Sequence, residues 1–153
     1  MKTLKYLSGV ILAASLFIAC DNGDADVPDS DDCSGQVCEA SPGTNEASTT
    51  VPNTLHGTYN MSIAYAESNS PYPQGTQATF TITADRLTVA IDGEECFSIV
   101  NPVTRGGLSA PLFKGDCVAD IAFQVAANQS GALEEINLVL ASGPGYYGQF
   151  RID

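Results

Sequence analysis

Residues 78–91 read ATFTITADRLTVAI and contain the clearest structural pattern of the chain. Apolar side chains alternate with polar or small ones on both sides of Asp85-Arg86, which predicts a tight turn. An alternation with a period of two is typical of a strand that is buried on one face. The side chains that share the apolar face are Phe80, Ile82, Leu87, Val89 and Ile91. The stretch therefore predicts a β-hairpin with its apolar face against a core.

Similar short runs fill the chain from residue 54 onward, and turn sequences such as Asp92-Gly93 and Gly143-Pro144-Gly145 separate them. No segment has a convincing helical period. The predicted strands cover residues 57–65, 78–84, 87–91, 96–100, 108–113, 118–126, 135–141 and 146–152. We expect an all-β, antiparallel domain over residues 54–153, built as a small barrel of about eight strands, with a β-sandwich as the alternative.

The start of this domain, Leu55-His-Gly-Thr-Tyr59, is similar to the Gly-x-Trp/Tyr entry of lipocalin-type barrels. The resemblance implies a small lipocalin-like barrel whose inward side chains either fill the interior or line a cup for an apolar ligand. The expected inward set is Tyr59, Ile63, Phe80, Ile82, Val89, Phe123, Leu138 and Phe150, and Tyr65 is expected on the same face as Tyr59. An immunoglobulin-like sandwich normally has a core Trp, and this chain has none.

The N-terminus predicts a targeting segment. Lys2 and Lys5 precede an uncharged apolar stretch, residues 7–19, which is too short to span a bilayer and typical of a signal peptide. Phe17-Ile18-Ala19-Cys20 resembles the lipobox of bacterial lipoproteins. The resemblance implies that residues 1–19 are removed and that Cys20 carries acyl chains, which anchor the protein to a membrane of the cell envelope. The following aspartates resemble surface-export signals, which favours the outer membrane and allows surface exposure. In other bacteria an Asp next to the lipidated cysteine retains the protein in the inner membrane, and this alternative stays open.

Residues 20–53 are expected to be a disordered acidic linker. Residues 21–53 contain eight Asp or Glu, no Lys or Arg and few large apolar residues. Such a composition cannot bury enough apolar surface to offset the entropy of ordering. Fully stretched, a segment of this length could reach on the order of 100 Å.

The five cysteines are an odd number for an exported protein, and lipidation of Cys20 would leave four for disulfides. Three pairings of Cys33, Cys38, Cys96 and Cys117 are formally available. The four residues fall into two separate regions, which favours the local pairs Cys33–Cys38 and Cys96–Cys117. A bridge between the latter two should add roughly 3 kcal/mol of stability.

The net charge of −12 excludes several partners. Nucleic acid and anionic lipid both require a basic surface. Residues 27–33 resemble the end of a calcium-binding thrombospondin type 3 repeat, but the aspartates of residues 21–32 match no EF-hand register. A calcium-stabilised, adhesin-like domain is therefore a minor alternative, and no metal or cofactor is assigned.

The sequence contains no convincing catalytic motif. Residues 107–111 come close to the G-x-S-x-G pattern of hydrolases, but Pro111 replaces the last glycine, and the single histidine, His56, lies at the start of the first strand. The acidic pairs Glu94-Glu95 and Glu134-Glu135 fall at predicted turns rather than across a cleft. We therefore expect that the protein is not an enzyme.

Aromatic side chains among Gly and Pro are the remaining candidates for binding. Tyr72 lies in a predicted loop, and Tyr146 and Tyr147 directly follow the predicted turn at residues 143–145, positions from which tyrosines can contact a ligand or a protein partner. The leading hypothesis is a membrane-anchored envelope lipoprotein whose β-domain interacts with a macromolecule or has a structural role. The alternatives are a lipocalin-like carrier of a small apolar ligand and the calcium-stabilised adhesin.

Overall fold

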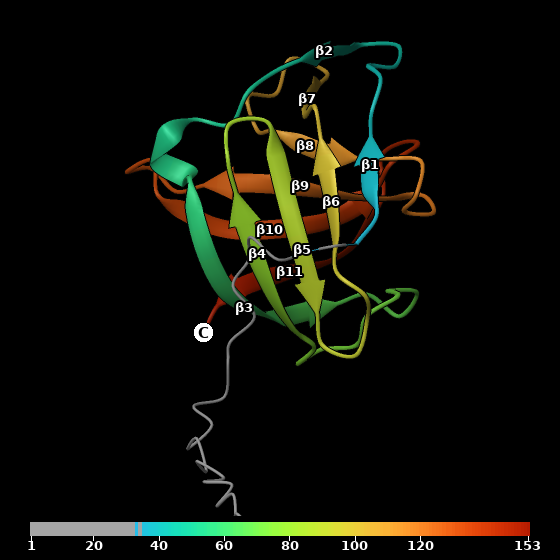
Figure 1. Cartoon of the computed structure of the whole chain (residues 1–153), viewed down its shortest axis with the longest axis vertical. Coiled ribbons are helices and arrows are strands. Elements are labelled where there is room, and N and C mark those ends of the chain that lie inside the picture. Colours follow the sequence, from blue (N-terminus) through green and yellow to red (C-terminus); the bar gives the residue numbers. More distant parts are fainter. Residues whose placement is uncertain (1–32, 34) are drawn as a thin grey trace, which may run out of the picture.

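The computed structural model describes Cys33 and residues 35–153, which form one curled sheet (Figure 1). Its strands are β1 (Val37–Glu39), β2 (Glu46–Ser48), β3 (Gly57–Ala66), β4 (Gln77–Ile82), β5 (Arg86–Ile91), β6 (Phe97–Val100), β7 (Val103–Arg105), β8 (Leu112–Lys114), β9 (Ile121–Ala127), β10 (Leu133–Leu140) and β11 (Tyr146–Ile152). One short 3-10 turn, η2 (Asn53–Leu55), precedes β3. The prediction of an all-β fold is confirmed. None of the helical turns in the described ranges is long and apolar enough to cross a bilayer.

The strands follow the order β1-β6-β5-β4-β3-β11-β10-β9-β8-β7-β2 and curl into a half-barrel. Neighbouring strands are antiparallel, except that β1 runs parallel to β6. There is one sheet rather than the two of a sandwich. The strand number exceeds the expected eight because β7 forms between the predicted strands at residues 96–100 and 108–113, and because β1 and β2 fall in the expected linker.

The β4–β5 hairpin forms as residues 78–91 predict. Phe80 pairs with Val89 and Ile82 pairs with Leu87, and all four side chains are buried. The Thr83 amide donates to the Arg86 carbonyl (2.9 Å) and closes the turn. The hairpin therefore presents one continuous apolar face to the concave side of the sheet.

The interior is filled by side chains. Seven of the eight residues expected to point inward are almost fully buried, and they belong to one hydrophobic cluster. Phe80 packs edge-on against Phe150 and Phe123, at centroid distances of 4.9 and 6.0 Å. Tyr59, the eighth, is partly buried and donates its hydroxyl to the Leu55 carbonyl (3.2 Å). Since the set that would line a ligand cup packs against itself, the structure does not favour a carrier of small apolar molecules.

The prediction of a disordered linker is wrong for residues 35–53, because this segment is part of the folded sheet. β1 adds to β6 at one end of the sheet and β2 adds to β7 at the other (Figure 1). Val51 is buried and its amide donates to the Ala84 carbonyl (2.8 Å). Composition predicted disorder because this segment cannot form a core of its own, but it is ordered by pairing with two existing sheet edges. Cys20 and the aspartates of residues 21–32 lie outside the described residues.

Glu46 connects β2 to two other strands. Its carboxylate lies 3.0 Å from Arg105 Nε and 2.6 Å from Lys114 Nζ, and it accepts a hydrogen bond from the Gly43 amide (2.7 Å). The Glu46 side chain is only 5% exposed. Burial raises its pKa, but the hydrogen bonds from Lys114, Gly43 and Arg105 outweigh that effect and hold the pKa below its usual value.

The four cysteines form two disulfides, but the expected pairing is wrong. Cys33 is bonded to Cys96 and Cys38 to Cys117, with Cα atoms 5.8 and 5.5 Å apart. Cys38 lies in β1 and Cys117 in the β8–β9 loop, so their bond joins one end of the sheet to a region near its other end. Gly115 packs directly against Cys38, which leaves no room for a side chain at that position. The prediction assumed that cysteines close in sequence pair with each other. It failed because the parallel pairing of β1 with β6 brings cysteines together that are distant along the chain.

One residue of β3 faces the opposite side from the one expected. Tyr65 is 47% exposed, whereas Met61 and Ile63 of the same strand are buried. Along the β3–β11 pair, Gln149 is opposite Tyr65 and Phe150 is opposite Ile63, so β3 has one extra residue at this step. A β-bulge of this kind reverses the alternation beyond it. Tyr65 therefore lies on the convex, outer face.

Candidate functional site

Tyr72, in the β3–β4 loop, lies beside a small hollow between this loop, the β5–β6 turn and the β8–β9 loop. The hollow has a volume of about 280 Å³, and its lining includes Tyr72, Glu94, Cys96 and Cys117. Tyr72 packs partly against the core and donates its hydroxyl to Glu94 Oε2 (3.2 Å). Burial, assisted by the charge of Glu94, raises the pKa of Tyr72 to about 12, so its phenol stays protonated. The hydroxyl is thus engaged within the protein, and part of the Tyr72 side chain is covered by the core.

The structure separates the other two candidate tyrosines. Tyr147 packs partly against the core, and its backbone carbonyl accepts from the Glu67 amide (2.8 Å). Tyr146 instead stacks on Tyr65, with ring centroids 6.2 Å apart and planes inclined by 24°. The three predicted residues therefore do not form one rim. Only Tyr146 contributes to an exposed aromatic pair, and its partner is a residue that the sequence pattern places in the core.

Polar side chains with planar ends surround this pair on the outer face of β3, β11 and β10. Cross-strand pairing places Gln149 opposite Tyr65, Asn137 opposite Gln149, and Glu135 opposite Arg151. Residues paired in this way have neighbouring side chains on the same face of a sheet. We call this surface the aromatic face, and its members are Tyr65, Tyr146, Gln149, Asn137, Glu135 and Arg151.

Hydrogen bonds hold these groups in fixed positions. With the amide orientation that satisfies both of its ends, Gln149 donates to Tyr146 Oη (3.0 Å) and Glu135 Oε2 (3.3 Å) and accepts from Arg151 Nε (3.1 Å). Arg151 Nη2 also donates to Glu135 Oε2 (2.9 Å), and Asn137 Nδ2 donates to Glu135 Oε1 (3.1 Å). The result is a connected network beside the tyrosine rings.

Both tyrosines of the face keep their protons at neutral pH. The hydrogen bond that Tyr65 donates to Glu67 Oε1 (2.8 Å) and the charge of that carboxylate raise the pKa of Tyr65. Burial, followed by the charge of Glu135, raises the pKa of Tyr146. The face therefore presents neutral phenol groups across the whole physiological pH range.

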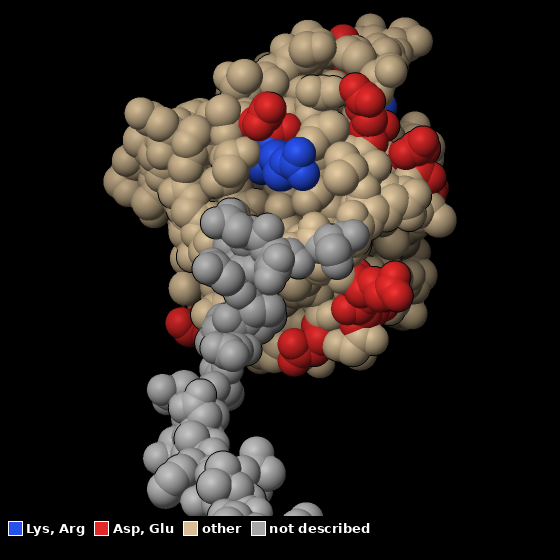
Figure 2. Space-filling view, viewed as in Figure 1, with Lys and Arg blue, Asp and Glu red and all other residues tan. Residues whose placement is uncertain are grey.

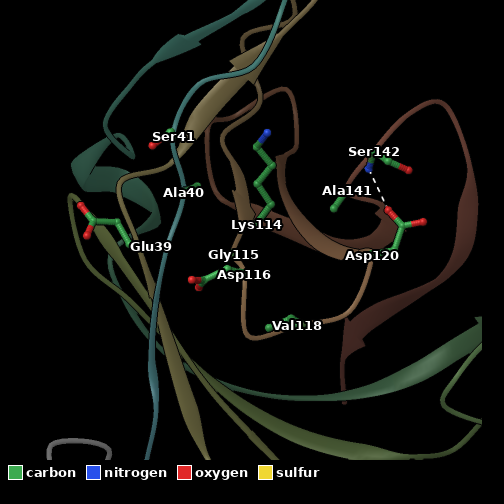
Figure 3. A pocket seen from close by; sticks show the side chains of 10 residues that line it. All are labelled: Glu39, Ala40, Ser41, Lys114, Gly115, Asp116, Val118, Asp120, Ala141 and Ser142. Carbon is green, nitrogen blue, oxygen red and sulfur yellow. Dashed lines mark hydrogen bonds between the residues drawn. The ribbon is translucent and has the colours of Figure 1, made fainter.

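A second hollow of about 410 Å³ lies between β1, the β8–β9 loop and the β10–β11 hairpin (Figure 3). Glu39, Asp116 and Asp120 line it but are spread around its margin (Figure 3). Asp120 Oδ1 accepts from the Ser142 amide (2.9 Å), and Lys114 is paired with Glu46. In the part of the chain that the structure describes, no three His, Cys, Asp or Glu side chains are arranged to hold a metal ion. Asp120 and Lys114 are therefore engaged within the protein.

The residues of the incomplete hydrolase pattern have other roles in the structure. His56 Nε2 donates to the Val51 carbonyl (3.0 Å), and Ser109 is exposed in the β7–β8 loop. Glu135 belongs to the aromatic face, whereas its neighbour Glu134 is exposed. Nothing in these contacts forms a nucleophile and base pair.

The surface charge is predominantly acidic. In the face shown in Figure 2, basic side chains lie near the centre beside acidic ones, and the charged side chains farther out are mostly acidic. Sequence comparison adds no assignment, since no family model, no curated protein and no solved structure matches this chain. The aromatic face is thus the best candidate site. Tyr65, one of its two tyrosines, could not have been identified from the sequence, because the alternation of apolar side chains in β3 gives no sign of the β-bulge.

Proposed function

We propose that this chain is a lipid-anchored protein of the cell envelope whose β-domain binds a macromolecule through the aromatic face, without catalysis. The stacked Tyr65–Tyr146 pair is the observation on which this proposal depends. Tyrosine combines a large rigid ring with a polar end, and for that reason it is frequent at binding surfaces. The hydrogen-bond network around the pair supports a site whose geometry exists before the ligand binds.

Anchoring would hold the domain close to the membrane. The Cys33–Cys96 bond attaches Cys33 to the domain, so the tether comprises residues 21–33 instead of residues 21–53. A segment of this shorter length can span at most about 45 Å. A binding face on a short tether would meet ligands near the membrane surface.

Lipid anchoring is tested by fractionation of cells that express the full chain. We expect the protein in the membrane fraction, with a mature N-terminus at Cys20 that carries the mass of the acyl chains. The Cys20→Ala variant should lack this mass and should not be processed at this position. Mass spectrometry that finds an unmodified Cys20 at a cleaved N-terminus would contradict the lipoprotein proposal.

Binding is tested with residues 20–153 carrying Cys20→Ser, labelled and added to envelope fragments of the source organism. Tyr65→Ala should reduce the bound fraction at least tenfold, because a tyrosine at the centre of an interface commonly contributes about 2 kcal/mol or more. Leu108→Ala is the matched control, since Leu108 is a 59% exposed apolar residue of the β7–β8 loop and is not a member of the aromatic face. Equal loss in both variants, or no binding by the parent protein, would count against the proposal.

A further inference from the structure

We infer that the ligand of the aromatic face is a neutral saccharide. This inference rests on the proposed function and narrows it to one chemical class. A sugar ring has an apolar C–H surface and a rim of hydroxyl groups. An aromatic ring stacks on the former, because its electron-rich face attracts the weakly positive C–H groups. Planar amide, carboxylate and guanidinium groups bond neighbouring hydroxyls through two atoms at once.

The aromatic face contains both kinds of group at suitable positions. Tyr65 is nearly half exposed and lies directly opposite Gln149, whose amide lies within the hydrogen-bond network. Asn137, Glu135 and Arg151 extend this network across two strands. Neighbouring strands are about 4.8 Å apart, so the face spans roughly 10 Å from β10 to β3, which is room for about two sugar rings.

The scarcity of exposed apolar surface argues against a protein partner. Among the described residues the strongly exposed large apolar side chains are Val37, Tyr65, Leu108 and Ile152, which come from β1, β3, the β7–β8 loop and the end of β11. The centre of a protein interface is normally a continuous apolar patch. Here the neighbours of the exposed ring are polar, which suits a hydroxyl-rich ligand better.

Charge argues for a neutral sugar over an acidic one. Arg151 is the basic member of the face, and its guanidinium is paired with Glu135. Glu67, which accepts from Tyr65, adds a negative charge at the edge. The net charge of −12 would repel a polyanion further. A neutral saccharide avoids this repulsion and can use the hydrogen-bonding capacity of the paired groups.

Affinity electrophoresis of the mature chain carrying Cys20→Ser tests this inference. The gels contain laminarin, mannan, dextran or xyloglucan as neutral probes, and alginate or polygalacturonate as acidic ones. At least one neutral probe should retard the protein, and the apparent Kd should rise tenfold or more in Tyr65→Ala. Tyr65→Phe keeps the ring and should retain most of the affinity, and Leu108→Ala should behave as the parent does. A melting temperature close to that of the parent shows that each variant is folded.

Several outcomes would overturn the inference: no retardation by any neutral probe, retardation by acidic probes alone, or an unchanged Kd in Tyr65→Ala. Envelope fragments separate this failure from failure of the proposed function. Periodate cleaves the vicinal diols of sugars and should abolish binding to the fragments if the ligand is a saccharide. Tyr65-dependent binding that survives periodate but is lost after proteolysis would retain the binding function and reject the sugar.

Discussion

Replacing Cys38 and Cys117 together with alanine should lower the free energy of unfolding by about 3 to 4 kcal/mol. With Cys33–Cys96 intact, the Cys38–Cys117 bond closes a ring of residues 33–38 and 96–117 in the unfolded chain, and the loop-closure entropy of a ring of this size corresponds to this value. In the folded state the variant also loses the covalent link between β1 and the β8–β9 loop. Denaturant unfolding under non-reducing conditions measures the change, and the melting temperature should fall by roughly 15 °C.

The same variant also tests the disulfide pairing. With Cys33 bonded to Cys96, the Cys38→Ala/Cys117→Ala protein carrying Cys20→Ser contains no free thiol. Under the local pairing Cys33–Cys38 and Cys96–Cys117, both bonds would be broken and two thiols would be exposed on unfolding. A thiol titration in denaturant decides between the two, and two free thiols would refute the pairing described here.

Glu46→Ala should destabilise the domain by about 2 kcal/mol, even though Glu46 lies in a segment whose composition predicts disorder. The substitution leaves Arg105 and Lys114 without their carboxylate partner, with side chains only 28% and 17% exposed. Loss of one partner from a fully buried pair costs about 3–5 kcal/mol, and the partial access of these cations to water reduces that penalty. Glu134→Ala removes an exposed acid at the start of β10 and should change stability by less than about 0.5 kcal/mol.

The effect of Glu46 should depend on pH. Its pKa in the folded protein is lower than in the unfolded chain, so the carboxylate contributes stability above a pH of about 4.5. This contribution is lost as the pH falls through the folded-state pKa. The difference in unfolding free energy between the parent and Glu46→Gln should therefore be larger at pH 7 than at pH 3. An equal difference at both values would show that the charge of Glu46 does not stabilise the fold.

Local alternation predicted the hairpin of residues 78–91 correctly because both strands are adjacent in the chain and bury the same face. It failed for Tyr65, since a bulge depends on how β3 pairs with β11, the last strand of the chain. Composition failed in the same way for residues 35–53. Their order derives from partners such as Val103 and Ser98, which no local window contains.

The sequence by itself determined the β class of the domain, the inward side chains of its hairpins and the expectation of an exported, lipid-anchored chain. These depend on side-chain alternation and on local composition, which are properties of neighbouring residues. Only the tertiary structure decided the disulfide pairs, the two strands at the ends of the sheet and the aromatic face. Each of these joins residues distant along the chain, and the free energy of such contacts exists only once the sheet has brought them together.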